Sequence, residues 1–357
     1  MIPATQLAAA RRPAPSAGAA TLIAGRQARI RKRVLLTAGL ASAVIVVFVV
    51  TLMVGNTFYD LDKVVRVIGG ETVPGASFTV GELRLPRASL GLITGLCFGI
   101  AGVTFQTMLR NPLASPDIIG ISSGASAAAV IGLIVFSFSE TIVSFLALGG
   151  ALVAAGAIYL LANRRGFAGA RLILIGIGVA AMLDSFVTYV LSRAVSWDLQ
   201  MAMQWLTGSL NGATWRSVLP VAIACVILVP VLLLNERHLG ALRLGDDSAA
   251  ALGVPVQRTR IMLIVSAVAL LAFATAASGP IAFVAFMAGP ITARIVGPGA
   301  SLTMPAGLIG ALLVLCADLV GQFAFDNRYP VGVITGVLGA PYLVYLLVRS
   351  NRSGGSL

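Results

Sequence analysis

The sequence predicts an all-α integral membrane protein with about ten transmembrane helices. Of its 357 residues, 58% are hydrophobic and only 11% are charged, whereas soluble domains carry about 25% charged residues. Long apolar segments recur along the chain, and about 20 such residues span the hydrocarbon core of a bilayer. Lys and Arg gather in alternate polar segments between them, as the positive-inside rule expects.

Ten apolar segments are candidates for membrane spans. They cover residues 34–54, 86–108, 118–137, 142–162, 171–191, 216–234, 261–277, 279–297, 302–322 and 331–348. The junctions at 138–141 and 278–280 are so short that the flanking helices must form tight hairpins. Residues 34–349 therefore form one transmembrane domain.

The segments that flank this domain are polar. Residues 1–33 hold seven Lys and Arg and no acidic residue, and their Ala, Pro, Ser, Gly and Arg composition predicts a disordered tail. Residues 350–357 form a second short tail. The segment 34–54 is too long for a signal-peptide core, and we interpret it as a retained first span.

The distribution of positive charge predicts the orientation. With the N-terminus inside, 18 of the 25 Lys and Arg residues fall in cytoplasmic segments, which favours an N-in, C-in topology. We therefore expect a multi-pass protein of the cytoplasmic (inner) membrane. The net charge of +12 belongs to this pattern and does not indicate binding to nucleic acid.

Polar and small residues inside the spans have structural and functional interpretations. Gly91, Gly95 and Gly99 lie four residues apart, a spacing that lets two helices approach closely. Asp184 and Asp318 are intramembrane carboxylates, which are costly in lipid. They either bond to neighbouring helices or line a transport pathway, for which Gln106 is a further candidate.

The sequence lacks the motifs of several kinds of catalytic and nucleotide-binding site. No GxxxxGK[ST] motif, HExxH motif or Ser/His/Asp set occurs, and the one histidine, His238, lies in a predicted loop. We therefore expect no catalytic residue, no metal site and no cofactor in this chain. Energy for transport must come from an ion gradient or from a partner protein.

The longest cytoplasmic segment after the N-terminal tail, residues 235–260, contains the sequence DDSAAALG. It predicts a short helix with Asp246 or Asp247 as N-cap, assisted by Ser248. Gly253 would end the helix in a left-handed conformation, and Pro255 follows. A rigid helix with a small Ala surface suits docking into a cleft on another protein. A structured loop without a partner is the alternative.

These motifs resemble the FecCD family, the permease subunits of ABC importers for iron-siderophores, haem and vitamin B12. The resemblance covers about residues 34–349. It rests on RLPR (84–87), FQxxLRNPLAxPxxxGxSxGA (105–125), LGDDSAAALGV (244–254), SGPIAFVAFMAGPITARIVG (278–297), ADLVGQ (317–322) and YPVGVITGVLGAPYLVYLL (329–347). It implies a BtuC-like type II importer fold with ten helices.

The resemblance also implies partners. They are two cytoplasmic ABC ATPase subunits, where ATP and Mg would bind, a second permease subunit in a homodimer or heterodimer, and an extracytoplasmic siderophore-binding protein. The residues expected to couple to the ATPase are Leu244, Gly245, Asp246, Asp247, Ser248, Ala249, Leu252 and Gly253. Arg84, Arg87 and Arg328 would meet the binding protein, or Arg84 and Arg87 would only anchor a helix at the lipid headgroups.

The polar stretch RNPLASPDIIGISSGAS, residues 110–126, interrupts two apolar segments. Asn111–Pro112 is expected to end the second span, and Pro116–Asp117 to start the third with Ser115 as a cap. We interpret the stretch as a cytoplasmic hinge that gates the pathway. Its residues are Arg110, Asn111, Pro112, Pro116, Gly120, Ser123 and Gly124.

Together these patterns predict the permease subunit of an ATP-driven importer for an iron-siderophore. A haem or cobalamin importer on the same scaffold stays open. An ion-coupled secondary transporter is the alternative from another class, although two isolated carboxylates do not make a proton relay.

Overall fold

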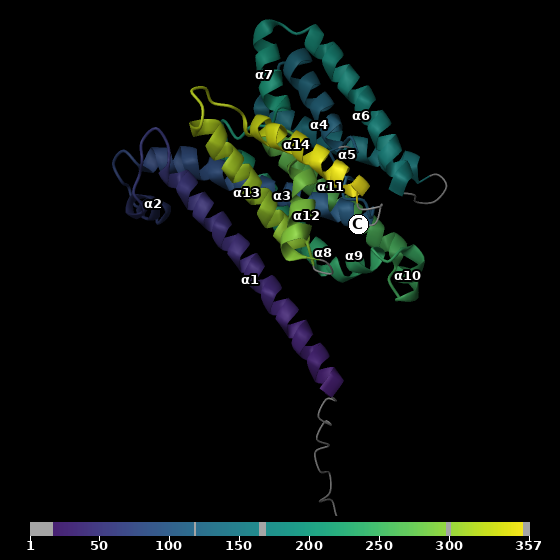
Figure 1. The fold of residues 1–357 in the computed structure, drawn as a ribbon. Coiled ribbons are helices and arrows are strands. Elements are labelled where there is room, and N and C mark those ends of the chain that lie inside the picture. The colour runs from purple at the N-terminus through teal and green to yellow at the C-terminus, as the bar shows by residue number, and fades with distance from the viewer. Residues whose placement is uncertain (1–16, 118, 164–168, 298–300, 353–357) are drawn as a thin grey trace, which may run out of the picture.

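The computed structural model describes residues 17–117, 119–163, 169–297 and 301–352, and every regular element in these ranges is a helix. Figure 1 shows their arrangement. In chain order they are α1 (Ala17–Met53), α2 (Leu61–Ile68), the π-helix η1 (Ser77–Arg84), α3 (Leu85–Met108), α4 (Ile121–Val130), the π-helix η2 (Ile131–Val135), α5 (Glu140–Ala162), α6 (Gly169–Ser192), α7 (Ser196–Leu206), α8 (Trp215–Leu234), α9 (Glu236–Leu242), α10 (Asp246–Ala251), α11 (Val256–Ser278), α12 (Val284–Val296), α13 (Thr303–Phe323) and α14 (Val331–Arg352).

The ten predicted spans correspond to ten apolar helices. Within the described ranges, eight helices are long and apolar enough to cross a bilayer, and two shorter apolar helices, 121–135 and 284–296, match the third and eighth segments. The all-α membrane fold is therefore confirmed. The four other helices, α2, α7, α9 and α10, lie in the connections between spans.

The first helix begins earlier than the sequence predicted. α1 starts at Ala17, so the expectation of a disordered tail is wrong for residues 17–33, and residues 1–16 lie outside the described part of the chain. Ala, Arg and Gln in this stretch have high helix propensity. They extend a helix that the membrane span has already nucleated, which removes the cost of a new nucleus. Of the C-terminal tail, residues 353–357 also lie outside the described part.

The third and eighth spans are shorter than expected because buried irregular segments precede them. α4 begins at Ile121, so the prediction that Pro116–Asp117 starts the helix is wrong; Gly120, with φ 88°, is its N-cap. α12 begins at Val284 after Phe283, whose φ is 63°. A left-handed residue cannot belong to a right-handed helix. Irregular backbone is tolerated at membrane depth where protein surrounds it.

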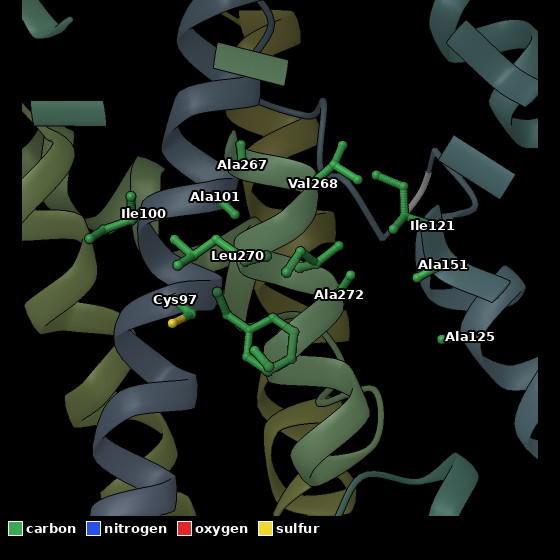
Figure 2. Packing of buried hydrophobic residues seen from close by; sticks show 14 of the residues in the cluster. Cys97, Ile100, Ala101, Ile121, Ala125, Ala151, Ala267, Val268, Leu270 and Ala272 are labelled. Carbon is green, nitrogen blue, oxygen red and sulfur yellow. The ribbon is translucent and has the colours of Figure 1, made fainter. Parts of the chain in front are cut away.

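Helix α3 lies at the centre of the bundle and packs against α13, α11, α12 and α8. Small side chains let these helices approach. Figure 2 shows Cys97 and Ala101 of α3 beside Leu270 of α11. All three side chains are buried.

The predicted glycine face of α3 is confirmed, and its main neighbour is α13. A Cβ added to Gly95 would lie 2.6 Å from the carbonyl oxygen of Gly310 and 2.7 Å from Cα of Ala311. A Cβ on Gly99 would meet the carbonyl of Ala306, and one on Gly91 would lie 2.9 Å from Leu210. Backbone therefore packs on backbone where the two helices cross, as in other membrane helix pairs.

The connections predicted to lie on one side of the membrane contact one another. On the predicted outer side, Arg328 donates to Asn56 at 3.0 Å, and the Ser209 amide donates to the Ser278 carbonyl at 2.8 Å. On the predicted inner side, Ser301 donates to Glu236. These three contacts agree with the predicted alternation of the connections between the two ends of the bundle.

The crossing of α3 and α13 leads to a stability prediction. Gly95→Ala should cost about 1–3 kcal/mol, because the methyl group overpacks the contact with Gly310. Gly156→Ala on α5 is the matched control, since an added Cβ there meets no atom within 4 Å. The temperature at which the detergent-solubilised protein loses its monodisperse elution peak should fall only for the first variant. Equal temperatures for both would contradict the close crossing.

Candidate functional site

The short helix α10 is held rigidly at both ends. Gly245 precedes it with φ 103°, and Gly253 follows it with φ 81°. At the C-terminal end, the amide of Val254 donates to the carbonyl of Ala249 at 3.0 Å, and that of Gly253 to Ala250 at 2.9 Å. This pair of bonds is a Schellman motif, which satisfies the last carbonyls of a helix. The predicted left-handed end at Gly253 is therefore confirmed.

The start of α10 differs from the prediction. The N-cap is Gly245 and no side chain caps the helix, so the expectation that Asp246 or Asp247 caps it is wrong. The Asp246 carboxylate accepts instead from Nη2 of Arg260 on α11, at 2.8 and 2.7 Å. Arg260 is buried and Asp246 half-buried. Because 14 residues separate the partners, no local spacing rule could identify Arg260 from the sequence.

One face of the coupling segment, residues 244–253, packs inward, and the other is exposed. Ala249 is buried within the chain, while Leu244 and Leu252 are 64% and 66% exposed. Asp247 and Ser248 are also exposed. Two exposed leucines beside small and acidic side chains form a compact apolar surface of the kind that docks on another protein.

The start of the coupling segment and the residue before it lie close to the inner end of α3 and to the loop that follows α3. Nη2 of Arg243 donates to Oγ1 of Thr107 at 3.3 Å. The Arg110 guanidinium lies so close to Gly245 that an added Cβ would be 3.5 Å from Nη1. The structure thus brings together two regions that the sequence identified separately, the coupling segment and the start of the predicted hinge.

In the predicted hinge, residues 110–126, the described residues 110–117 precede the start of α4 in a loop with a turn at Arg110. Arg110 has φ 52°, and the Asn111 side chain accepts from the Leu113 amide at 2.9 Å. Pro112 is half-buried and Pro116 is buried. A backbone turned out of helical geometry at Arg110 ends the second span before Pro112 is reached.

Asp117 is the titratable group of this loop. Burial raises the pKa of its carboxyl to about 6, although a hydrogen bond from Ser122 opposes the shift. The Ser122 hydroxyl donates to Oδ1 at 2.8 Å, and Oδ2 is buried without a hydrogen-bond partner. Desolvation disfavours the charged form of a carboxylate, which explains the direction.

The other hinge residues pack against neighbouring helices. A Cβ on Gly120 would lie 3.0 Å from the Gly176 carbonyl of α6, and one on Gly124 would lie 2.6 Å from the Gly150 carbonyl of α5. Ser123, which lies between these two glycines in the sequence, is half-buried. Gly120 and Gly124 therefore give α4 its close contacts with α6 and α5.

The three predicted docking arginines line one cavity at the outer end. The cavity has a volume of about 310 Å³, and its lining includes Arg84, Arg87, Arg328 and Gln322. The three cations come from η1, α3 and the α13–α14 connection. The sequence did not reveal that they share a cavity, because Arg328 lies more than 200 residues from the other two.

Two of these arginines, Arg84 and Arg87, each donate several hydrogen bonds inside the chain. Arg84 donates to the carbonyl oxygens of Leu52, Met53 and Thr57 at 2.9, 2.9 and 2.6 Å. It thereby satisfies orphan carbonyls at the C-terminal end of α1, where a positive charge is also favourable. Arg84 is thus bound to protein carbonyls, in contrast with the expectation of a free rim cation or a headgroup anchor.

Arg87 forms an ion pair with Asp318 of α13. Its Nη2 lies 2.7 Å from Oδ1 and its Nε 3.0 Å from Oδ2. Arg87 also donates to Asn211, and Gln322 donates to Asp318 at 2.6 Å. Asp318 is 2% exposed, so the bonded, structural interpretation is confirmed, and a role in lining the pathway stays a prediction. The i,i+4 spacing of Asp318 and Gln322 was the one sequence signal for this network.

The two remaining pathway candidates differ in placement. Gln106 is only 7% exposed, and its amide donates to the Phe286 carbonyl of α12 at 2.9 Å. It bridges two helices inside the chain, and its assignment to the pathway stays a prediction. Asp184 of α6 is exposed, and its role stays a prediction.

Comparison with known proteins assigns the chain to a family. The model of the FecCD transport family matches residues 43–349. The ferric enterobactin transport system permease protein FepG of Escherichia coli K12 is 38% identical over 325 residues, covering 90% of this chain and 98% of that protein. The achromobactin transport system permease protein CbrC of Dickeya dadantii is 38% identical over 336 residues, covering 92% and 96% respectively.

A solved structure shares the whole fold. A metal-chelate type ABC transporter in an inward-facing conformation superposes with a TM-score of 0.78 at 25% identity, covering 88% of this chain and 98% of that one. The chain belongs to the FecCD transport family and is a multi-pass permease of the cytoplasmic membrane.

Proposed function

We propose that this chain is the transmembrane permease subunit of an ATP-driven importer that translocates a ferric siderophore across the cytoplasmic membrane. The observation that carries the substrate class is the 38% identity, over nine-tenths of the chain, to permeases named for ferric enterobactin and achromobactin transport. The rigid coupling segment supports the dependence on a separate ATPase, since the chain has no phosphate-binding loop of its own.

In this proposal, α10 receives motion from a cytoplasmic ATPase subunit. Leu244 and Leu252 would enter its cleft, while the Asp246–Arg260 ion pair joins α10 to the spanning helix α11. Separating this pair would be costly, because it would leave the buried guanidinium without its compensating charge. Movement of α10 would therefore reach α11 directly, and would reach α3 through Arg243 and Arg110.

The remaining partners follow from the family. Two ATPase subunits, an extracytoplasmic siderophore-binding protein and a second permease subunit complete the proposed importer, and we favour a heterodimer of two permeases. The exposed residue Asp184 on α6 is the candidate for the pathway wall. The predicted hinge, residues 110–126, whose Arg110 lies next to Gly245 of the coupling segment, is the candidate inner gate.

Uptake in a deletion strain tests the proposed substrate. Cells lacking this gene should lose accumulation of one class of ⁵⁵Fe-labelled siderophore, and a plasmid copy should restore it. Labelled haem and cobalamin serve as parallel substrates. Loss of haem or cobalamin uptake with intact siderophore uptake would contradict the proposed substrate while retaining the importer.

Substitution of Gly253 tests the coupling role. Gly253→Val should disfavour the φ of 81° by about 1–2 kcal/mol, which lowers the population of the docked conformation about 5–30-fold. ATP hydrolysis stimulated by the loaded binding protein should fall accordingly in the reconstituted importer. Gly253→Asn is the matched control, because Asn tolerates left-handed backbone. Full stimulation in the Val variant would exclude this segment from coupling.

Two of the outer arginines should have different roles, Arg328 in capture of the binding protein and Arg87 in stability of the fold. Arg328 is exposed and donates a hydrogen bond to a neutral side chain, Asn56. Arg328→Glu should weaken capture of the binding protein, most strongly at low ionic strength. Arg87→Gln should instead lower the free energy of unfolding by about 3–5 kcal/mol, because it leaves the buried Asp318 carboxylate without its cationic partner. The melting temperature should fall with it.

Binding curves of the two variants at low and high salt, together with melting curves in detergent, separate these effects. An Arg328→Glu variant that binds like the parent at both salt concentrations would remove Arg328 from the docking surface. An Arg87→Gln variant with unchanged stability would show that the ion pair contributes nothing to the fold.

A further inference from the structure

The helix α2 lies beside the outer end of α1, at the edge of the bundle (Figure 1). Its Val64 is buried in a small cluster with Leu52 of α1 and Val80 of η1. Val67 packs near Gly81 of η1, where an added Cβ would lie 3.6 Å from its Cγ1. One edge of α2 is therefore fixed to the protein.

A second edge of α2 is apolar and exposed. Leu61, Val65 and Ile68 are 50%, 58% and 52% exposed. They occupy positions i, i+4 and i+7, which fall within an arc of about 60° on a helix of 3.6 residues per turn. Three branched aliphatic side chains in one stripe are an unfavourable surface in water.

The third edge of α2 is charged. Lys63 and Arg66 project from it, and Arg66 pairs with Glu71 at 2.6 Å and with Asp62 at 3.8 Å. An apolar edge opposite a charged edge is the pattern of a helix that lies in the plane of a membrane interface. The internal ion pairs leave little charge on this edge for recognition of a protein partner.

We infer that α2 lies in the outer interface of the bilayer, with Leu61, Val65 and Ile68 inserted at the boundary between headgroups and acyl chains. We assign lipid as the occupant of the stripe because α2 packs on a helix that is itself a candidate membrane span with exposed apolar side chains. α2 packs on the last turns of α1, whose Ile45 and Val46 are exposed side chains within a membrane span.

The size of the stripe supports the same occupant. A stable protein–protein interface buries about 800 Å² on each partner, and three aliphatic side chains provide much less. Phe58, just before α2, is also exposed. Aromatic residues are enriched at the depth of the headgroups.

This placement has a consequence for the outer cavity. The connection between α1 and α2 supplies the Thr57 carbonyl that accepts from Arg84 and the Tyr59 ring over which the Arg84 guanidinium lies, 4.9 Å from the centroid. The depth of α2 in the lipid therefore sets the position of one wall of that cavity.

Spin-label accessibility tests the inference in the assembled importer in liposomes. Cys97, Cys225 and Cys316 are replaced by Ala, and a nitroxide is attached at Val65→Cys or, as the matched control, at Lys63→Cys on the charged edge. The label at Val65 should collide several-fold more with oxygen, which concentrates in lipid, than with a water-soluble nickel chelate. The label at Lys63 should show the opposite preference.

Two results would overturn the inference. One is equal nickel accessibility at the two positions, which would place the apolar stripe in water. The other is immobilisation of the Val65 label only when binding protein is added, which would assign the stripe to a protein partner. Quenching of a Val65→Trp variant by brominated lipids, relative to the parent, provides a second measurement if labelling impairs assembly. A variant that is quenched no more than the parent would also overturn the inference.

Discussion

The close approach of α3 to its neighbours determines how the rest of the bundle is arranged. Where α3 crosses α13, the backbone of Gly95 meets the backbone of Gly310, and no side chain fits between them. At Gly102 the same is true against the Ala285 carbonyl of α12. In lipid, helices gain little from hydrophobic association, so packing of this kind supplies much of the interaction between them.

The two ends of the bundle are each organised by an Arg–Asp pair. At the outer end, Arg87 and Asp318 join α3 to α13, and at the inner end Arg260 and Asp246 join α11 to α10. In both pairs one partner is buried, which makes loss of the other partner costly. Each pair therefore resists separation of the two helices that it connects.

Helix α3 is common to both ends. Its outer end carries Arg87 at the cavity, and its inner end carries Thr107, which accepts from Arg243, the residue just before the coupling segment. A helix of this length spans about 36 Å, enough to cross the hydrocarbon core. A rotation or tilt of α3 would change both ends at once, so this helix is the shortest rigid connection between the two candidate sites.

The sequence by itself determined the membrane class, the ten apolar helices and the alternation of their connections, because hydropathy and helix length are local properties. It also identified the glycine-terminated α10, since the Schellman end at Gly253 depends only on neighbouring residues. It could not determine where the third and eighth spans begin. Left-handed residues at Gly120 and Phe283 follow from the packing of surrounding helices.

Only the tertiary structure decided which polar side chains meet. Asp318 and Gln106 were candidates for a pathway, yet they are buried against Arg87 and the Phe286 carbonyl. Asp246 was expected to cap a helix, yet it pairs with Arg260. Each partner comes from another helix or from a distant turn, and a buried polar group bonds to whatever donor the fold brings near. That choice depends on helix packing, which local sequence patterns do not encode.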